Sequence, residues 1–97
     1  MYGTLLRACA KPGKRGEVVA MMGEGLDTRG FRATYLLLPD DDEDAVVAGV
    51  LFEDRTTYSA NAHDPATDAW YRRFRALLEA DPEWTDGDWI AFLPPRG

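Results

Sequence analysis

The sequence predicts an α+β fold in which helices cover one face of a four-stranded antiparallel sheet. Two observations lead to this prediction. Strand-like and helix-like stretches follow one another in the order βαββαβ. In addition, the apolar run from Asp44 to Phe52 breaks directly into a helix-start signal at Asp54, which sets the organisation of the second half of the chain.

The first half of the chain contains two predicted strands and one predicted helix. Tyr2 to Ala10 is the first strand, and the turn at Lys11 to Lys14, which contains Pro and Gly, ends it. Gly30 to Leu38 is the second strand, and the polar link Pro39 to Asp44 leads to the third. The helix is predicted from apolar side chains that recur at helical spacing and fill the core: Val18, Met21, Met22 and Leu26.

The second half contains two predicted helices and the last strand. Asp54 can cap a short helix over Thr56 to Ala62, because its side chain accepts a hydrogen bond from a free backbone N–H. Asp64 caps a longer helix over Pro65 to Ala80, in which proline suits the first position. The last strand is predicted over Trp84 to Leu93. One side of the longer helix is apolar and consists of Trp70, Phe74, Leu77 and Leu78.

This order is the split arrangement of the ferredoxin-like fold, and both faces of its sheet are apolar. In the second strand one face carries Phe31, Ala33, Tyr35 and Leu37, and the other carries Thr34, Leu36 and Leu38. Helices cover only one face, so the other would be an exposed apolar patch unless a partner covers it. We therefore predict a homodimer that packs sheet to sheet about a two-fold axis.

The composition excludes several classes of partner. The formal net charge of -6 argues against nucleic acids and anionic membranes, because an acidic field repels phosphate. No apolar run approaches the roughly 20 residues that span a bilayer, and the N-terminus lacks the order of a signal peptide. We expect a cytoplasmic protein.

Two further features have simple interpretations. Cys9 is the only cysteine, so no internal disulfide can form, and we expect a small buried side chain rather than a reactive thiol. The acidic run Asp40 to Asp44 is expected to be a solvated loop. The alternative is a calcium site, but the run lacks the Gly and the later Glu of an EF-hand loop.

Several short features occur in one order along nearly the whole chain: the first strand, Pro12-Gly13, Gly30-Phe31-Arg32-Ala33-Thr34-Tyr35, Phe52-Glu53-Asp54, Tyr58, Asp64-Pro65 and the closing Trp-rich strand. In order and spacing the chain resembles the antibiotic biosynthesis monooxygenase-like family of dimeric α/β barrels. The resemblance implies a sheet-to-sheet dimer with a pocket between sheet and helices in each subunit. It also implies a planar aromatic or quinol-like substrate and no metal or flavin.

In the oxygenases of this family that need no cofactor, deprotonation of the substrate gives an anion that reduces dioxygen directly. The protein shelters the rings, helps the proton leave and stabilises the anion. Tyr58 stands where these enzymes place a Tyr. Phe52 replaces their Trp and Ala48 their Asn, while their Arg falls near Tyr71 or Arg72.

The haem-degrading branch of the family uses an Asn on the first strand and an axial His on a helix. Arg7 or its neighbours replace that Asn here. His63 is the only histidine, and it lies between two helix starts, where an axial ligand would be poorly held. Haem is therefore not the expected cofactor.

Tyr58 and His63 are the candidates for proton chemistry. Tyr58 is predicted to donate a hydrogen bond to a substrate anion, or else to pack on the sheet with its hydroxyl at the surface. His63 is a candidate general base, because the pKa of an ordinary imidazole is about 6.5, and its alternative role is that of a hydrated or capping loop residue.

The substrate-binding candidates are less specific. Trp70 either forms the wall of an aromatic pocket or packs in the core, and Asn61 either hydrogen-bonds a carbonyl group or ends the short helix. Arg7, if buried, needs a carboxylate or an anionic substrate as its partner. The full set is Arg7, Tyr35, Phe52, Asn61, Trp70 and Tyr71.

The leading interpretation is a cofactor-independent monooxygenase that acts on a planar aromatic small molecule. One alternative is a dimer of the same fold that binds such a molecule without chemistry. Another is a structural interaction domain with a closed core. A pocket of about 300 Å³ or more separates the first two interpretations from the third.

Overall fold

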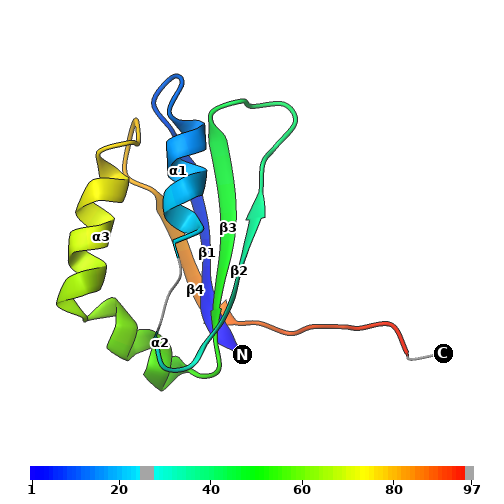
Figure 1. Cartoon of the computed structure of the whole chain (residues 1–97). Coiled ribbons are helices and arrows are strands. Elements are labelled where there is room, and N and C mark those ends of the chain that lie inside the picture. The colour runs from blue at the N-terminus through cyan, green and yellow to red at the C-terminus, as the bar shows by residue number, and fades with distance from the viewer. Residues whose placement is uncertain (25–27, 96–97) are drawn as a thin grey trace.

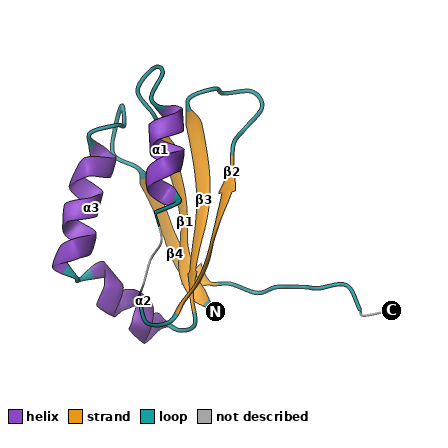
Figure 2. Ribbon diagram, viewed as in Figure 1, coloured by secondary structure: helices purple, strands orange, loops and turns teal. Residues whose placement is uncertain are grey.

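The computed structural model describes residues 1–24 and 28–95 and shows one sheet with helices against one of its faces (Figures 1 and 2). The strand order is β2-β3-β1-β4, and all neighbouring strands are antiparallel. This is the α+β, ferredoxin-like fold that the sequence predicts. The elements in chain order are β1 (Tyr2–Cys9), α1 (Arg15–Met22), β2 (Phe31–Leu37), β3 (Ala45–Phe52), α2 (Arg55–Ala62), α3 (Pro65–Arg75) and β4 (Glu83–Asp88).

The hydrophobic core lies between the sheet and the helices α1 and α3. The central strands β1 and β3 pair over their whole length, from Tyr2 opposite Phe52 to Cys9 opposite Ala45. From α1 the expected side chains Val18 and Met22 are buried in this core, while Leu26 lies outside the described residues. The other buried members of the core cluster are Leu6, Ala8, Ala10, Val46, Ala48, Phe74 and Leu78.

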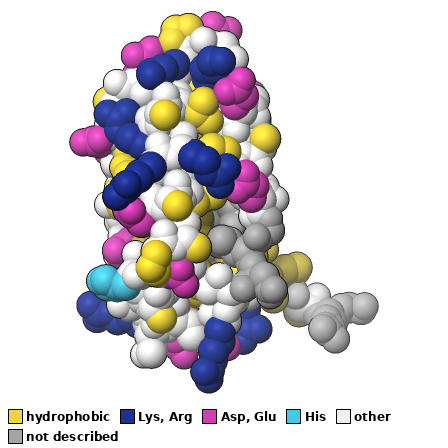
Figure 3. All heavy atoms as spheres, turned by 60° about the vertical axis from the view of Figure 1, so that its left-hand side comes forward, with side chains coloured by type: hydrophobic (Ala, Val, Ile, Leu, Met, Phe, Trp, Pro, Cys, Tyr) yellow, Lys and Arg dark blue, Asp and Glu magenta, His cyan; other side chains and the backbone are white. Residues whose placement is uncertain are grey.

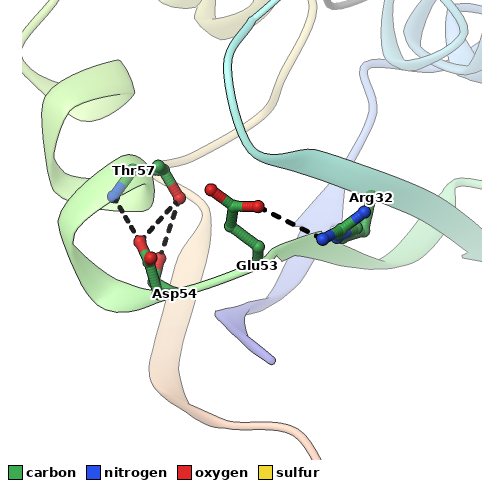
Figure 4. Close-up of polar contacts among 4 residues, drawn as sticks. All are labelled: Arg32, Glu53, Asp54 and Thr57. Carbon is green, nitrogen blue, oxygen red and sulfur yellow. Dashed lines mark hydrogen bonds and ion pairs between the residues drawn. The ribbon is translucent and has the colours of Figure 1, made fainter.

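Both predicted helix caps are present. The Oδ1 atom of Asp54 accepts a hydrogen bond from the backbone N–H of Thr57 at 2.8 Å, as Figure 4 shows. This bond is the main reason why the pKa of Asp54 lies below its ordinary value. Gly30 approaches the same cap closely, since a Cβ there would lie 2.5 Å from the hydroxyl oxygen of Thr57. Asp64 caps α3 through the backbone N–H of Ala66 at 2.8 Å.

A β-bulge changes the predicted faces of β2. Phe31 lies opposite Phe52, but Ala33 lies opposite Leu51, so one extra residue is accommodated between them. Phe31 therefore packs on the helix side, with its ring 5.8 Å from that of Phe52, and the prediction that it shares a face with Ala33 is wrong. The extra residue is Arg32, which pairs with Glu53 at 3.2 Å (Figure 4).

Helix α3 ends at Arg75, so the prediction that it continues to Ala80 is wrong. The chain after the helix bonds to the end of β1 instead. The backbone N–H of Lys11 donates to the carbonyl of Leu77 at 2.8 Å, and that of Glu79 donates to the carbonyl of Cys9 at 2.9 Å. These tertiary hydrogen bonds replace the last turns of the helix, which explains the early end.

Strand β4 also differs from its prediction, because it covers Glu83–Asp88 and not residues 84–93. Gly87 pairs with Gly3 inside the strand, so Asp86-Gly87, a pair typical of turns, forms no turn here. The strand ends where its partner ends: the last backbone bond joins the Trp89 N–H to the Met1 carbonyl at 2.8 Å. Beyond it, residues 90–95 run away from the sheet (Figure 1).

Cys9 is exposed, so the expectation of a buried side chain is wrong. Its position in β1 alternates with the buried Ala8, which places the thiol on the face that the helices leave open. Partial desolvation, followed by the nearby carboxylates of Asp42, Asp44 and Glu79, raises the pKa of Cys9. The thiol form is therefore favoured over the reactive thiolate.

The face opposite the helices is apolar, as predicted, and part of it is open to solvent. Leu5, Tyr35 and Leu37 point to this outer face, and their exposed fractions are 43%, 68% and 62%. Ile90 and Phe92, in the segment after β4, are also largely exposed. None of the described helices is long and apolar enough to cross a membrane.

We expect the ring of Phe74 to be a main contributor to stability. Phe74→Ala removes a fully buried ring that packs between the sheet and Trp70, so the free energy of unfolding should fall by about 3–5 kcal/mol. Urea unfolding at a fixed protein concentration measures this loss. Arg72→Ala on the same helix removes only an exposed ion pair with Asp68 and should change the value by less than about 0.5 kcal/mol. Equal losses in the two variants would contradict this view of the core.

Candidate active site

A cavity of about 690 Å³ lies between the helix-side face of the sheet and the helices, and we call it the helix-side cavity. Its size falls in the range of small-molecule sites, and it rules out a closed core. The sheet contributes a floor of small and apolar side chains, and the helices contribute polar and aromatic ones. Those used below are Thr4, Met21, Glu24, Phe52, Tyr58, Asn61, Ala66, Trp70, Tyr71, Arg73 and Trp84.

Aromatic rings form much of the wall. Phe52 is buried, and its ring meets that of Tyr58 edge to face at 5.7 Å. Trp70 stacks on Phe74 one helical turn later, and its indole N–H donates to the carbonyl of Met21 at 3.3 Å. The ring centroids of Tyr71 and Trp84 lie 6.2 Å apart. Such a wall suits a flat, apolar ligand, because stacking between aromatic rings is energetically favourable.

Tyr58 is half-buried on α2 and joins the cavity to β4. Its hydroxyl donates a hydrogen bond to the Oδ1 atom of Asp86 at 2.9 Å. Burial, followed by the hydrogen bond and the charge of Asp86, raises the pKa of Tyr58 to about 12. The phenol is therefore neutral at ordinary pH and already has an acceptor for its proton.

Asp86 is a residue that the sequence reasoning missed. It lies opposite Thr4 in the pairing of β1 with β4, on the helix side of the sheet. The residue lies inside the predicted last strand, but the Asp86-Gly87 pair is typical of a turn, and its side chain was not considered as a partner. The useful signal was the period of two in Trp84, Asp86 and Asp88, which places these side chains on one face.

Asn61 lies on the cavity wall, where two hydroxyls hold its side chain. Thr28 and Thr67 both donate to its Oδ1 atom, at 3.4 Å and 3.3 Å. The amide oxygen is therefore committed to the protein, which fixes the direction of the amide group.

Three predicted site residues lie away from the cavity. Arg7 and Tyr35 are exposed on the outer face of the sheet. His63 is exposed at the end of α2, with its Nδ1 atom 2.7 Å from the carbonyl oxygen of Ser59. A carbonyl oxygen only accepts, so Nδ1 carries the proton in this contact. The structure thus brings together Phe52, Tyr58, Asn61, Trp70 and Tyr71 but not these three residues.

The charged groups at the cavity are of both signs. Arg73 lines the cavity, and its guanidinium group lies 3.3 Å from the Glu24 carboxylate. The surface on the helix side shows positive and negative side chains interspersed with apolar ones (Figure 3). Within residues 1–24 and 28–95, no group of three or more His, Cys, Asp or Glu side chains is placed to hold a metal ion.

Comparison with known proteins finds similarity in structure. No family model matches the chain, and no curated protein sequence matches it. A monooxygenase from the gene ActVA-Orf6 of Streptomyces coelicolor, solved in complex with the ligand nanaomycin D, is 17% identical with a TM-score of 0.82. The alignment covers 98% of this chain and 92% of that one. The chain has the fold of the antibiotic biosynthesis monooxygenases.

Two other solved structures share this fold. A proposed antibiotic biosynthesis monooxygenase from Deinococcus radiodurans is 9% identical, with a TM-score of 0.78 and all of both chains covered. Rv0793 from Mycobacterium tuberculosis is 15% identical, with a TM-score of 0.74 over 96% of this chain and 98% of that one. The predicted resemblance to the antibiotic biosynthesis monooxygenase-like family is confirmed at the level of the fold, while activity needs its own argument.

The raised pKa of Tyr58 can be tested by titration. The tyrosine absorbance that is lost in Tyr58→Phe should titrate near pH 12, and Asp86→Asn should lower this value while burial keeps it above the ordinary 10.0. The unfolded chain releases this proton first, so the associated stability is complete below pH 10.0 and is lost as the pH rises toward 12. A value unchanged by Asp86→Asn would contradict the hydrogen bond.

Proposed function

We propose that this protein is a cofactor-independent monooxygenase that binds a planar aromatic, quinol-like molecule in the helix-side cavity. The observation that carries the proposal is the cavity itself, whose wall includes several aromatic residues, Tyr58 among them. The fold that the chain shares with a monooxygenase from Streptomyces coelicolor adds support. The identity of 17% leaves the chemistry to be argued from these residues.

The proposed reaction uses electrons from the substrate itself. Loss of a proton from a phenolic or benzylic position gives a delocalised anion, which transfers electrons to dioxygen. In the oxidation of a ring CH₂ group to C=O, one oxygen atom enters the substrate and the other leaves as water, so no external reductant is needed. The protein has to bind the rings, accept the proton and exclude bulk water.

The residues divide between these tasks. The rings of Phe52, Trp70 and Tyr71 provide flat apolar surface against which an aromatic substrate packs. Tyr58 faces the proton that must leave. Phe52 and Ala48 occupy the positions where the resemblance implies a Trp and an Asn, so the proposed site relies on shape and on Tyr58 rather than on those two groups.

The test is oxygen uptake by the purified protein with anthrones and naphthohydroquinones. Uptake should exceed the uncatalysed rate, and Ala66→Trp, which inserts a ring at the cavity wall, should lower it by about tenfold or more. Ala69→Trp is the matched control, because Ala69 is also exposed on α3 but does not line the cavity. Both variants should keep the thermal stability of the unmodified protein within a few degrees.

The same experiment distinguishes the alternative, a non-catalytic dimer that binds small ligands. Ligand-induced thermal shifts that disappear in Ala66→Trp, without any oxygen uptake, would favour binding alone. Absence of both uptake and thermal shifts would contradict a small-molecule site in this cavity.

We also propose that two copies of the chain form a homodimer through the outer face. Its exposed side chains Leu5, Tyr35 and Leu37 form an apolar surface on the sheet, next to which the apolar segment of residues 90–93 leaves the body. A second copy, turned about a two-fold axis, presents the same apolar surface to the first. Burial of apolar surface is the main favourable contribution to the free energy of protein association.

The dimer is tested by Leu37→Asp in sedimentation experiments. A charge buried in an apolar interface has no partner there, so the dissociation constant should rise by at least about a hundredfold. Ala69→Asp adds the same charge on α3 and should leave the dimer intact. If the unmodified protein sediments as a monomer at micromolar concentration, the proposal of a dimer is contradicted.

A further inference from the structure

The contact between Tyr58 and Asp86 crosses from the cavity to the solvent. Tyr58 is part of the cavity wall, whereas Asp86 is exposed on β4 and is not part of that wall. Their hydrogen bond is 2.9 Å long and joins two elements 28 residues apart in sequence. The register of β4 against Thr4 fixes the carboxylate at this point. The pair thus joins a residue of the cavity wall to an exposed carboxylate on β4.

The direction of this bond decides what Tyr58 presents to a ligand. An ionised carboxylate only accepts hydrogen bonds, so the phenol O–H must point toward Asp86. The phenol oxygen has two lone pairs, so it can still accept from a partner in the cavity beside the Thr4 hydroxyl. Tyr58 is therefore oriented to receive a proton from a substrate O–H group. This differs from the role that the sequence suggests, which is donation of a hydrogen bond to a substrate anion.

We propose that Tyr58 and Asp86 form a proton relay that removes the hydroxyl proton of the bound aromatic molecule. This inference rests on the proposed function. The substrate O–H bond breaks and its proton passes to the oxygen of Tyr58, while the Tyr58 proton passes to the carboxylate of Asp86. The products are the substrate anion, a neutral Tyr58 and a protonated Asp86, so charge and atoms balance.

The environment of each group suits its part in the relay. A free tyrosinate is disfavoured, because the pKa of Tyr58 is raised to about 12, and a concerted transfer avoids forming it. Asp86 is exposed and can pass its proton to water, which resets the pair for the next turnover. Asp86 acts through Tyr58, so it is a positioning and accepting residue and not one that touches the substrate.

Other ionisable or polar groups surround the pair. From β1, the ring of Tyr2 lies 5.3 Å from that of Tyr58, with the Arg55 guanidinium of α2 5.6 Å from the Tyr2 ring. The Thr4 hydroxyl opposes the raised pKa of Tyr58 by hydrogen bonding. From β4, Asp88 lies opposite Tyr2. The neighbouring strand β3 contributes the apolar Phe52.

The experiment measures the specificity constant for oxygen uptake between pH 4 and pH 9. Asp86→Asn and Tyr58→Phe should each lower it by about 10²–10⁴-fold, and the double variant should be no worse than either single one, because a relay fails when either member is lost. The unmodified protein should lose activity at acid pH, and this decline should disappear in Asp86→Asn. Asp88→Asn, the same change two residues away, should retain both rate and profile.

A second variant keeps the test decisive if Asp86→Asn folds poorly. In Asp86→Ala, added acetate should restore uptake in proportion to its concentration, whereas it should not restore Tyr58→Phe. A merely structural role for Asp86 would give no such rescue. Full activity in a folded Asp86→Asn variant, or no rescue of Asp86→Ala, would overturn the relay and leave the proposed function intact. Absence of uptake by the unmodified protein would overturn the proposed function, and the relay with it.

Discussion

The register of the central strand β1 is the constraint on which the rest of the structure depends. β1 pairs with β3 on one side over eight residues and with β4 on the other over six. Side chains alternate along a strand, so a shift of one residue would exchange the buried Leu6 and Ala8 for the exposed Leu5 and Arg7. Burial of the apolar set under α1 and α3 therefore selects one register, and that register also brings Asp86 opposite Thr4.

The site is a consequence of how the helices meet this sheet. Phe74 and Leu78 belong to the same buried core cluster as Ala8 and Ala10 of the first strand region. Toward α2 the helix-side cavity lies between the sheet and the helices, and aromatic rings form part of its wall. Because Tyr58 is half-buried there, its hydroxyl needs a partner, and Asp86 supplies it. The same bond satisfies a polar group for folding and orients it for chemistry.

A chain of 97 residues buries a modest core, and this one leaves much apolar surface on the outer face of its sheet. The fold is shared with proteins from Streptomyces, Deinococcus and Mycobacterium at identities of 9–17%, which shows how little sequence the arrangement requires. Such a fold supports different activities, since the side chains at the cavity decide the chemistry. Here Phe52 and Ala48 distinguish the cavity from the pattern that the resemblance implies, while Tyr58 agrees with it.

Local sequence determines the strands, the helix starts and the fold class. Periodicity and the capping pairs at Asp54 and Asp64 act within a few residues, so these features are predictable without tertiary information. Several residues of the cavity wall, including Tyr58 and Trp70, were among the candidates that the sequence offered, because aromatic residues on helices next to a sheet have few other places to lie. The tertiary structure decides what depends on partners distant in sequence. The bulge at Arg32 turns Phe31 to the helix side, and the strand register joins Asp86 to Tyr58. Bonds to the last residues of β1 shorten α3, and β4 stops where β1 begins. In each case a hydrogen-bonding partner from another part of the chain overrides the local preference, and local sequence carries no record of that partner.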